Sequence, residues 1–181
     1  MIQPSISRHA RTRDVLHSIE TGRRPGAPAA QLLDAWDEDI RIGAFDTDQL
    51  ALDLDLHLRS FAAQRYGQRP SRLVWQCSLR ADPRGPGVPG AQLAQLGRDI
   101  LHATGVARSH EADGCRWALI RVSPHEARIV APLMTPGGEV RDTTASRPLA
   151  LAVCQLSDRR HGTAPTGTGS APTPVVPGRR R

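Results

Sequence analysis

The segment 115–134 constrains the fold of this chain more than any other, because its side chains alternate on both sides of a turn. Residues 115–122 and 127–134 each present at least one apolar face, and a side-chain period of two is typical of β-strands. Between them, Pro124 fixes the φ angle that the second position of a tight turn needs. The segment therefore predicts a β-hairpin that reverses at 123–126.

A strand and a helix are predicted before this hairpin. Residues 73–80 alternate between two faces, one of which carries Trp75 and Cys77. Between 93 and 101, four apolar residues recur at helical spacing, and Gly105 follows as a residue that can take the left-handed cap conformation. The predicted central unit is therefore strand, helix, strand, strand.

Two further helices are predicted outside this unit. Residues 48–65 are expected to form a helix because the apolar run is long, although its leucines also alternate as in a strand. A last short helix is expected over 148–156, with Ser146 as its N-cap. The apolar residues that share one face of this helix are Leu149, Ala152, Val153 and Leu156.

Length and apolar content indicate one folded domain, residues 1–156, followed by a tail. Residues 157–181 are rich in Pro, Gly, Thr and Ser and end in Arg179, Arg180 and Arg181. Such a segment buries too little apolar surface to fold, so it is predicted to be disordered. The predicted fold class is α/β (α+β), with a central, mainly antiparallel sheet flanked by helices.

Cysteine usage and hydropathy predict a cytoplasmic protein with no membrane role. The three cysteines show no close pairing, and neither an apolar signal segment at 1–14 nor a long apolar run is present. Cys77 and Cys115 share apolar strand faces with Trp75 and Trp117, so buried reduced thiols and core tryptophans are expected. An exposed tryptophan stacked on a DNA base is the alternative.

Charge is distributed unevenly along the chain. Every basic residue is an arginine, a side chain that binds phosphate well. Between residues 34 and 55, eight acidic residues are opposed only by Arg41, whereas the segments on both sides are basic. This distribution fits a DNA groove bordered by an acidic flank, and it fits a mixed, solvated surface equally well.

Three blocks of the sequence, Val74 to Ala81, Gly114 to Arg121 and Ile129 to Leu133, resemble consecutive blocks of actinobacterial relaxases. These are mobilisation nucleases that nick plasmid or integrative-element DNA. The resemblance extends to residues 1–8, 35–37 and the helix after Asp142, and so spans most of 1–162. It implies a relaxase-like fold. It also implies a divalent metal held by three histidines and acidic residues, and a nucleophilic tyrosine near the N-terminus.

The metal-binding positions implied by this resemblance hold other residues. The three histidine positions read Val122, Glu126 and Arg128, and the acidic pair reads Pro124 and His125. Valine has no lone pair and arginine repels a cation, whereas a divalent ion needs several convergent donors. The sequence therefore predicts that the metal site is lost and that the protein has no cofactor.

The nucleophile implied by the resemblance is also missing. The segment 15–20, where the tyrosines are expected, contains Ser18 and Glu20 but no tyrosine. Ser18 could attack a phosphate only if a base or a metal activated it, and none is evident. Tyr66, the one tyrosine in the chain, lies near the end of the predicted 48–65 helix. No catalytic residue is predicted.

Phosphate binding is the activity that these residues could retain. Arg128 would place a guanidinium near the former metal position, where it could hold a DNA phosphate without activating it. Arg80, Arg121 and His125 are the further DNA-binding candidates. The plainer interpretations are that Arg128 is an ordinary polar residue on a strand face and that His125 is a solvated turn residue.

Three classes of function remain open from the sequence. The first is a relaxase-like protein that binds single-stranded or transfer-origin DNA without nicking it, as an accessory to an intact relaxase or other mobilisation proteins. The second is a divergent nuclease that is still active with a metal. The third is a protein-interaction domain that kept only the fold and uses the acidic segment 34–55 as its contact surface.

Overall fold

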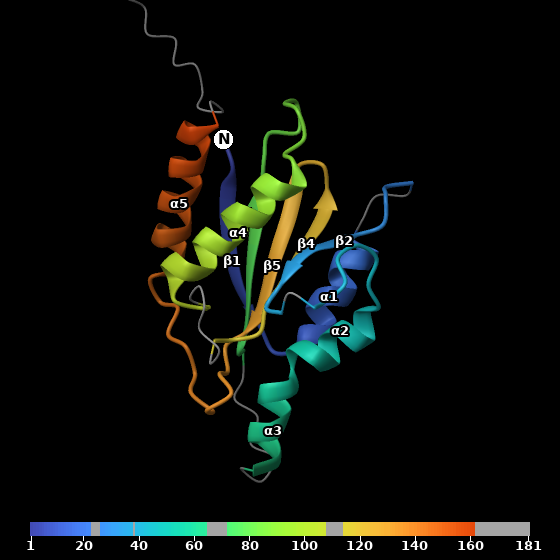
Figure 1. Ribbon diagram of the computed structural model, residues 1–181, viewed down its shortest axis with the longest axis vertical. Helices are drawn as coiled ribbons and strands as arrows, with labels where there is room; N and C mark the ends of the chain where they lie inside the picture. Colours follow the sequence, from blue (N-terminus) through green and yellow to red (C-terminus); the bar gives the residue numbers. More distant parts are fainter. Residues whose placement is uncertain (23–25, 38, 65–71, 108–113, 162–181) are drawn as a thin grey trace, which may run out of the picture.

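A five-stranded antiparallel sheet organises the part of the chain that the computed structural model describes, which is residues 1–22, 26–37, 39–64, 72–107 and 114–161 (Figure 1). The strands lie in the order β1-β3-β5-β4-β2, and every neighbouring pair is antiparallel. The elements in chain order are β1 (Gln3–His9), α1 (Thr12–Thr21), β2 (Gln31–Ala35), α2 (Thr47–Leu54), α3 (Leu56–Gln64), β3 (Val74–Arg80), α4 (Gly90–Thr104), β4 (Ala118–Ser123), β5 (Glu126–Pro132) and α5 (Ser146–Arg160).

The predicted hairpin is confirmed as β4 and β5. Ser123 lies opposite Glu126, so Pro124 and His125 form the turn. β5 lies between β3 and β4, so the strand that carries Trp75 is not a neighbour of the strand that follows Trp117. β5 suits this central position because it contributes buried apolar side chains to both faces of the sheet.

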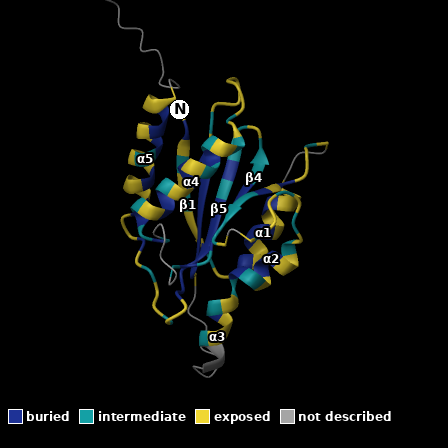
Figure 2. Ribbon diagram, in the orientation of Figure 1, coloured by how far each residue is buried: buried dark blue, intermediate teal, exposed yellow. Residues whose placement is uncertain are grey.

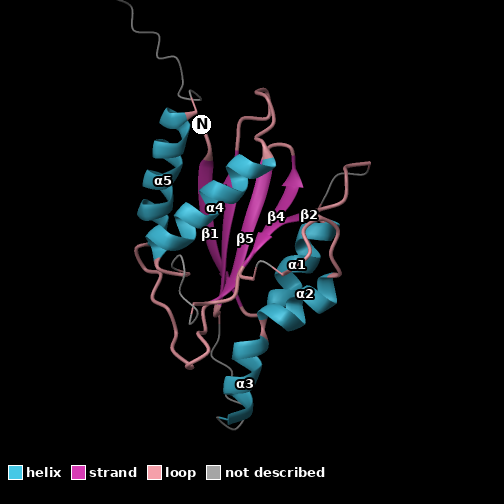
Figure 3. Ribbon diagram, viewed as in Figure 1, coloured by secondary structure: helices cyan, strands magenta, loops and turns pink. Residues whose placement is uncertain are grey.

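The sheet separates two apolar cores (Figures 2 and 3). The first core lies between the sheet and helices α4 and α5, and it includes Trp75, Trp117 and Ile129. The second core lies between the other face of the sheet and helices α1 and α2, and it includes Leu16 and Ile120. Both tryptophans are therefore core residues, as expected.

Helix α4 confirms the helix predicted upstream of the hairpin. It ends at Gly105, whose φ of 71° is the left-handed conformation that glycine adopts without steric cost. Gly97 allows a close approach to β4, because a Cβ atom at this position would lie 3.1 Å from Leu119 Cδ2. The absence of a side chain at Gly97 is therefore what lets α4 lie close against the sheet.

The predicted helix over 48–65 is two helices, α2 and α3, interrupted at Asp55. The two helices bury their leucines in different places. Leu54 packs in the second core, whereas Leu58 packs with Leu73 and Met134 in a separate cluster. The break at Asp55 separates the two helices, and Leu58 lies in α3, which extends away from α2 (Figure 1). Tyr66 lies outside the described residues.

Helix α5 is longer than predicted and buries a different face. Its inward side chains are small or polar and are Ser146, Ala150, Cys154, Ser157 and Asp158. Leu149 and Leu156, which were predicted to share the apolar face, are 39% and 50% exposed. The small residues let the helix lie close to the sheet, and two hydrogen bonds fix its rotation: Trp75 Nε1 donates to Ser146 Oγ and Ile2 N to Asp158. Ser146 is the first residue of α5 and Ala145 is the N-cap, so the prediction of Ser146 as N-cap is wrong.

The predicted start of the tail at Ser157 is wrong, because α5 continues to Arg160 and Ser157 and Asp158 are buried in it. The apolar pattern of α5 fades before the helix ends, so periodicity predicts a boundary at 156 that is four residues short of Arg160. The remainder of the predicted disordered segment, residues 162–181, lies outside the described residues.

Cys77 and Cys115 are buried thiols, as expected, and so is Cys154; none of the three forms a disulfide. Burial raises the pKa of Cys77, and it raises the pKa of Cys154 to about 12, so both thiols stay protonated at neutral pH. No helix among the described residues combines the length and the apolar character that crossing a bilayer requires.

Candidate nucleic-acid interface

The sheet face against which α1 and α2 pack also has a polar part, which lies on β1, β3 and β5. Cross-strand partners point to the same face, and two such rows cross β1, β3 and β5: Gln3 with Arg80 and Glu126, and Ser5 with Ser78 and Arg128. A third row pairs Ser7 with Gln76. We call this set the polar sheet face, and its members are Gln3, Ser5, Ser7, Gln76, Ser78, Arg80, Glu126 and Arg128. Gln3, Ser5 and Ser7, on the edge strand, are exposed.

Two arginines of the polar sheet face meet at one carboxylate. Arg128 Nε donates to Glu126 Oε1 at 2.9 Å, and Arg80 Nε lies 3.5 Å from the same oxygen. The side chain of Arg80 is 60% exposed, whereas those of Glu126 and Arg128 are only 20% and 18% exposed. The three groups carry a net positive charge, and the terminal guanidinium nitrogens keep N–H donors that Glu126 does not occupy.

The neighbouring polar side chains are ordered by hydrogen bonds. Gln76 Nε2 donates to Ser78 Oγ at 3.0 Å, and Ser7 Oγ lies 2.9 Å from His9 Nε2. Gln76 and Ser78 are each only 7% exposed, so the hydroxyl and amide groups nearest the sheet centre have fixed positions. The groups that this face can offer to a ligand are therefore the Arg80 guanidinium and the hydroxyls of Ser5 and Ser7, whereas Gln76 and Ser78 are buried.

Arg121 does not belong to this surface. It points to the face of the first core, where its Nη2 donates to the carbonyl of Val88 at 2.8 Å and its Nε to the carbonyl of Ser123 at 3.4 Å. These bonds join the loop before α4 to the hairpin. The shared parity of Arg121 with Leu119 in the sequence could have indicated this, because Arg128 lies opposite Ile120 on the other face.

His125 is half-buried in the hairpin turn, so its prediction as a solvated turn residue is wrong. The backbone N–H of His125 donates to Ser123 Oγ at 3.2 Å, and its backbone carbonyl accepts from Ala81 N at 2.8 Å. Val88 N donates to the carbonyl of Pro124 at 2.9 Å. The loop that follows β3 thus packs over the turn, and within the described residues the ring Nδ1 of His125 is buried without a hydrogen-bond partner.

The other positions that the resemblance singles out hold side chains with ordinary packing roles. Val122 is half-buried against the second core. Ser18 is exposed on α1 and its hydroxyl donates to the carbonyl of Val15 at 2.7 Å; Glu20 is exposed on the same helix. Within the described ranges, no three His, Cys, Asp or Glu side chains are grouped so that they could hold a metal ion.

Several carboxylates of the acidic segment 34–55 have partners inside the fold. Asp34 Oδ2 lies 2.5 Å from Arg98 Nη1, and Asp48 Oδ1 lies 2.7 Å from Arg13 Nε. Asp46 caps α2 by accepting from Gln49 N at 2.8 Å. The part of the acidic charge that these residues carry therefore stabilises the fold locally.

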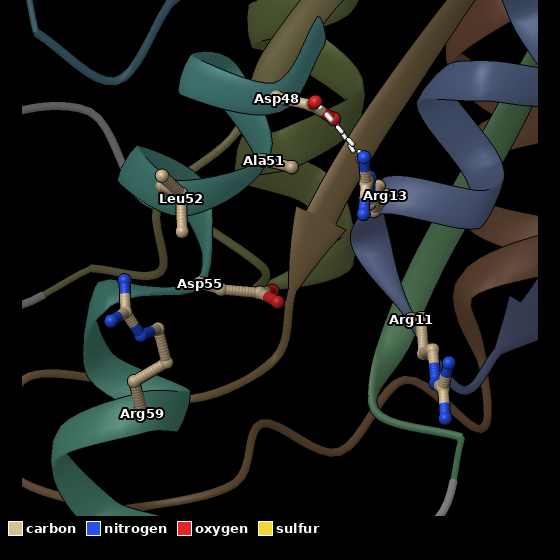
Figure 4. Close-up of a pocket in the computed structure, with 7 residues that line it drawn as sticks. All are labelled: Arg11, Arg13, Asp48, Ala51, Leu52, Asp55 and Arg59. Carbon is tan, nitrogen blue, oxygen red and sulfur yellow. Dashed lines mark hydrogen bonds and ion pairs between the residues drawn. The ribbon is translucent and has the colours of Figure 1, made fainter.

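A groove rich in arginine lies where α1, α2 and α3 meet (Figure 4). Its volume is about 550 Å³, and it is lined by Arg11, Arg13, Asp48, Ala51, Leu52, Asp55 and Arg59. We call it the arginine groove. Sequence reasoning missed it, because its residues come from segments more than 30 positions apart that only the folded chain brings together and no spacing signal connects them.

Comparisons of the chain with models of protein families, with curated proteins and with solved structures found no match. The resemblance to relaxases consequently depends on the sequence blocks alone. What the polar sheet face and the arginine groove can bind follows from their residues and geometry.

Proposed function

We propose that this chain is a relaxase-like protein that binds single-stranded DNA on the polar sheet face without cleaving it. The observation that carries the proposal is the Arg80–Glu126–Arg128 trio, two guanidiniums gathered around one carboxylate on an otherwise hydroxyl- and amide-bearing face. In mobilisation, such a protein would act as an accessory or a competitor at a transfer origin, beside an intact relaxase.

Phosphate is the ligand that best matches the trio. Guanidinium groups bind phosphate through paired N–H donors, and Arg80 is exposed enough to reach a backbone that passes over the sheet. Glu126 contacts both arginines at their Nε atoms and does not occupy the N–H donors of the terminal nitrogens. The hydroxyls of Ser5 and Ser7, on the exposed edge strand, add neutral donors beside this charge.

Binding is expected to tolerate changes of DNA sequence. Trp75 and Trp117 are buried in the first core, so neither is placed to stack on a base. Contacts to phosphates do not read base identity. Affinity should therefore come mainly from charge and fall steeply as the salt concentration rises.

The proposed lack of cleavage rests on the residues at the positions that the resemblance assigns to chemistry. Val122 packs against apolar side chains, and Arg128 is a permanent cation that holds a phosphate but supplies no nucleophile. The protein-interaction alternative has less support, because Asp34, Asp46 and Asp48 already have partners within the fold.

Fluorescence anisotropy with a labelled single-stranded oligonucleotide at low salt tests the binding. We expect the double substitution Arg80→Ala, Arg128→Ala to weaken the affinity at least about tenfold, which corresponds to ~1.4 kcal/mol. The double substitution Arg147→Ala, Arg159→Ala is the matched control, since it removes the same two charges from exposed sites on α5, across the sheet. The proposal fails if wild-type protein does not bind, or if the Arg80→Ala, Arg128→Ala variant binds as well as this control.

The proposed inactivity has its own test. Supercoiled plasmid incubated with the protein and magnesium or manganese should stay supercoiled. Metal-dependent nicking by the wild type would overturn the inactivity and favour the divergent nuclease, whatever the binding experiment shows.

A further inference from the structure

Two arginines of the arginine groove, Arg11 and Arg59, differ from Arg13 because neither is paired with a carboxylate among the described residues. Asp48 accepts from both Nε and Nη2 of Arg13, at 2.7 and 2.9 Å. Asp55 accepts a hydrogen bond from the hydroxyl of Thr12. Arg11 and Arg59 are exposed, and within the described part of the chain neither has an ion-pair partner. In Figure 4 these two arginines lie on either side of Asp55.

The groove also has an apolar wall. Ala51 is buried at its base, whereas Leu52 is 47% exposed and faces the same space. A volume of about 550 Å³ is large enough for a phosphate together with part of a nucleoside. Two free guanidiniums beside an apolar wall suit a nucleotide unit better than a simple inorganic anion.

The groove lies on the same side of the sheet as the polar sheet face. Helices α1 and α2, which supply most of its lining, pack on that side. Strand β1 connects the two places: Gln3 lies opposite Arg80, and the strand ends at His9, two residues before Arg11. The eight steps of extended protein chain from Gln3 to Arg11 span about 26 Å. An extended single strand of DNA needs several nucleotides to cover this distance.

We propose that the arginine groove is a second phosphate-binding site, which holds the same DNA strand after it has passed along β1 from the Arg80–Glu126–Arg128 trio. The inference rests on the proposed DNA binding. It adds that the DNA strand runs along β1 and that only DNA above a minimum length contacts both sites. Ser5, Ser7 and His9 line the path between the two sites. A short oligonucleotide fills only the trio, whereas a longer one reaches Arg11 and Arg59.

Anisotropy titrations with oligothymidylates of about 4 and about 16 nucleotides test this arrangement. We expect the Arg11→Ala, Arg59→Ala variant to bind the longer oligonucleotide about tenfold more weakly than wild type, and the shorter one within about twofold of wild type. The Arg80→Ala, Arg128→Ala variant should lose affinity for both lengths. A second groove variant, Arg11→Gln with Arg59→Gln, keeps more of the side-chain packing and should show the same length dependence.

Each outcome separates the two proposals. If the groove variants bind the longer oligonucleotide as wild type does while the trio variant is weakened, the second site is wrong and the DNA-binding function stands. If the groove variants weaken both lengths equally, the groove is not a second, length-dependent site and the inference is wrong. If wild type binds neither length, the proposed function itself fails and the second site fails with it.

Discussion

Arginines that look alike in the sequence have different roles at the scale of single residues. Arg128 and Arg80 share the carboxylate of Glu126 on the polar sheet face. Arg121 instead donates to backbone carbonyls and holds a loop. Arg116 donates to the carbonyl of Asp53 at 2.7 Å and lies 4.9 Å from the centre of the Trp36 ring. Only the partners of each guanidinium, and not its charge, distinguish a ligand-binding arginine from a structural one.

The stability of the fold should depend on pH through His57, next to Arg116. Burial and then the positive charge of Arg116 lower the pKa of His57 below its ordinary value of 6.5. The unfolded chain therefore binds a proton here more readily than the folded chain. The contribution of His57 to the free energy of unfolding should be at its maximum above pH 6.5. It should fall as the pH drops from 6.5 toward the lower pKa of the folded state.

Urea unfolding of wild type and His57→Gln at pH values above and below 6.5 measures this dependence. On acidification, the free energy of unfolding of the variant should fall less than that of wild type. His17→Gln, on the exposed side of α1, is the control for loss of a histidine. Equal pH slopes for wild type and His57→Gln would contradict the assignment.

At the scale of elements, helix contacts depend on small residues as much as on apolar ones. Helix α4 approaches β4 through Gly97, and α5 approaches the first core through Ala150 and Cys154. Helices α2 and α3 are separated at Asp55, so that Leu54 and Leu58 reach different clusters. The contacts at Gly97, Ala150 and Cys154 depend on shape, because a larger side chain would push the helix away from its neighbour.

Gly97→Val should destabilise the protein by about 1–3 kcal/mol, the typical cost of overpacking a tight core site. The first added carbon would lie 3.1 Å from Leu119 Cδ2, and Leu119 is fully buried and has little room to move. Chemical denaturation gives the free energy of unfolding. Gly90→Ala is the control in the same helix, because its Cβ would meet Leu33 at an ordinary 3.5 Å. Stability unchanged in Gly97→Val would show that α4 does not pack this closely.

At the scale of the whole molecule, the first strand and the last helix are held together. Ile2 N donates to both carboxylate oxygens of Asp158, at 2.9 and 3.3 Å, although the two residues are 156 positions apart. Asp158 is only 3% exposed. Edge strand β1, which carries one side of the polar sheet face, is thereby fixed to the helix that covers the opposite face of the sheet.

Asp158→Ala should lower the free energy of unfolding by about 1.5–3 kcal/mol, because it removes a charged acceptor and leaves the buried Ile2 N–H without it. Thermal unfolding followed by circular dichroism should show a melting temperature lowered by several degrees. Asp99→Ala, which removes only an exposed bond to Gln95, should change stability by less than about 0.5 kcal/mol. Equal melting temperatures for the two variants would show that the Asp158 contact contributes little.

The local elements near the centre of the chain follow from the sequence alone. β3, the hairpin and α4 with its Gly105 cap could be predicted, because side-chain period and turn chemistry act over a few neighbouring residues. The tertiary structure alone decided which strands are neighbours, which face of α5 is buried, where the helix breaks at Asp55, and that Glu126 lies between two arginines. It alone formed the arginine groove. These features depend on contacts between residues far apart in the chain, and no local pattern of polarity carries that information.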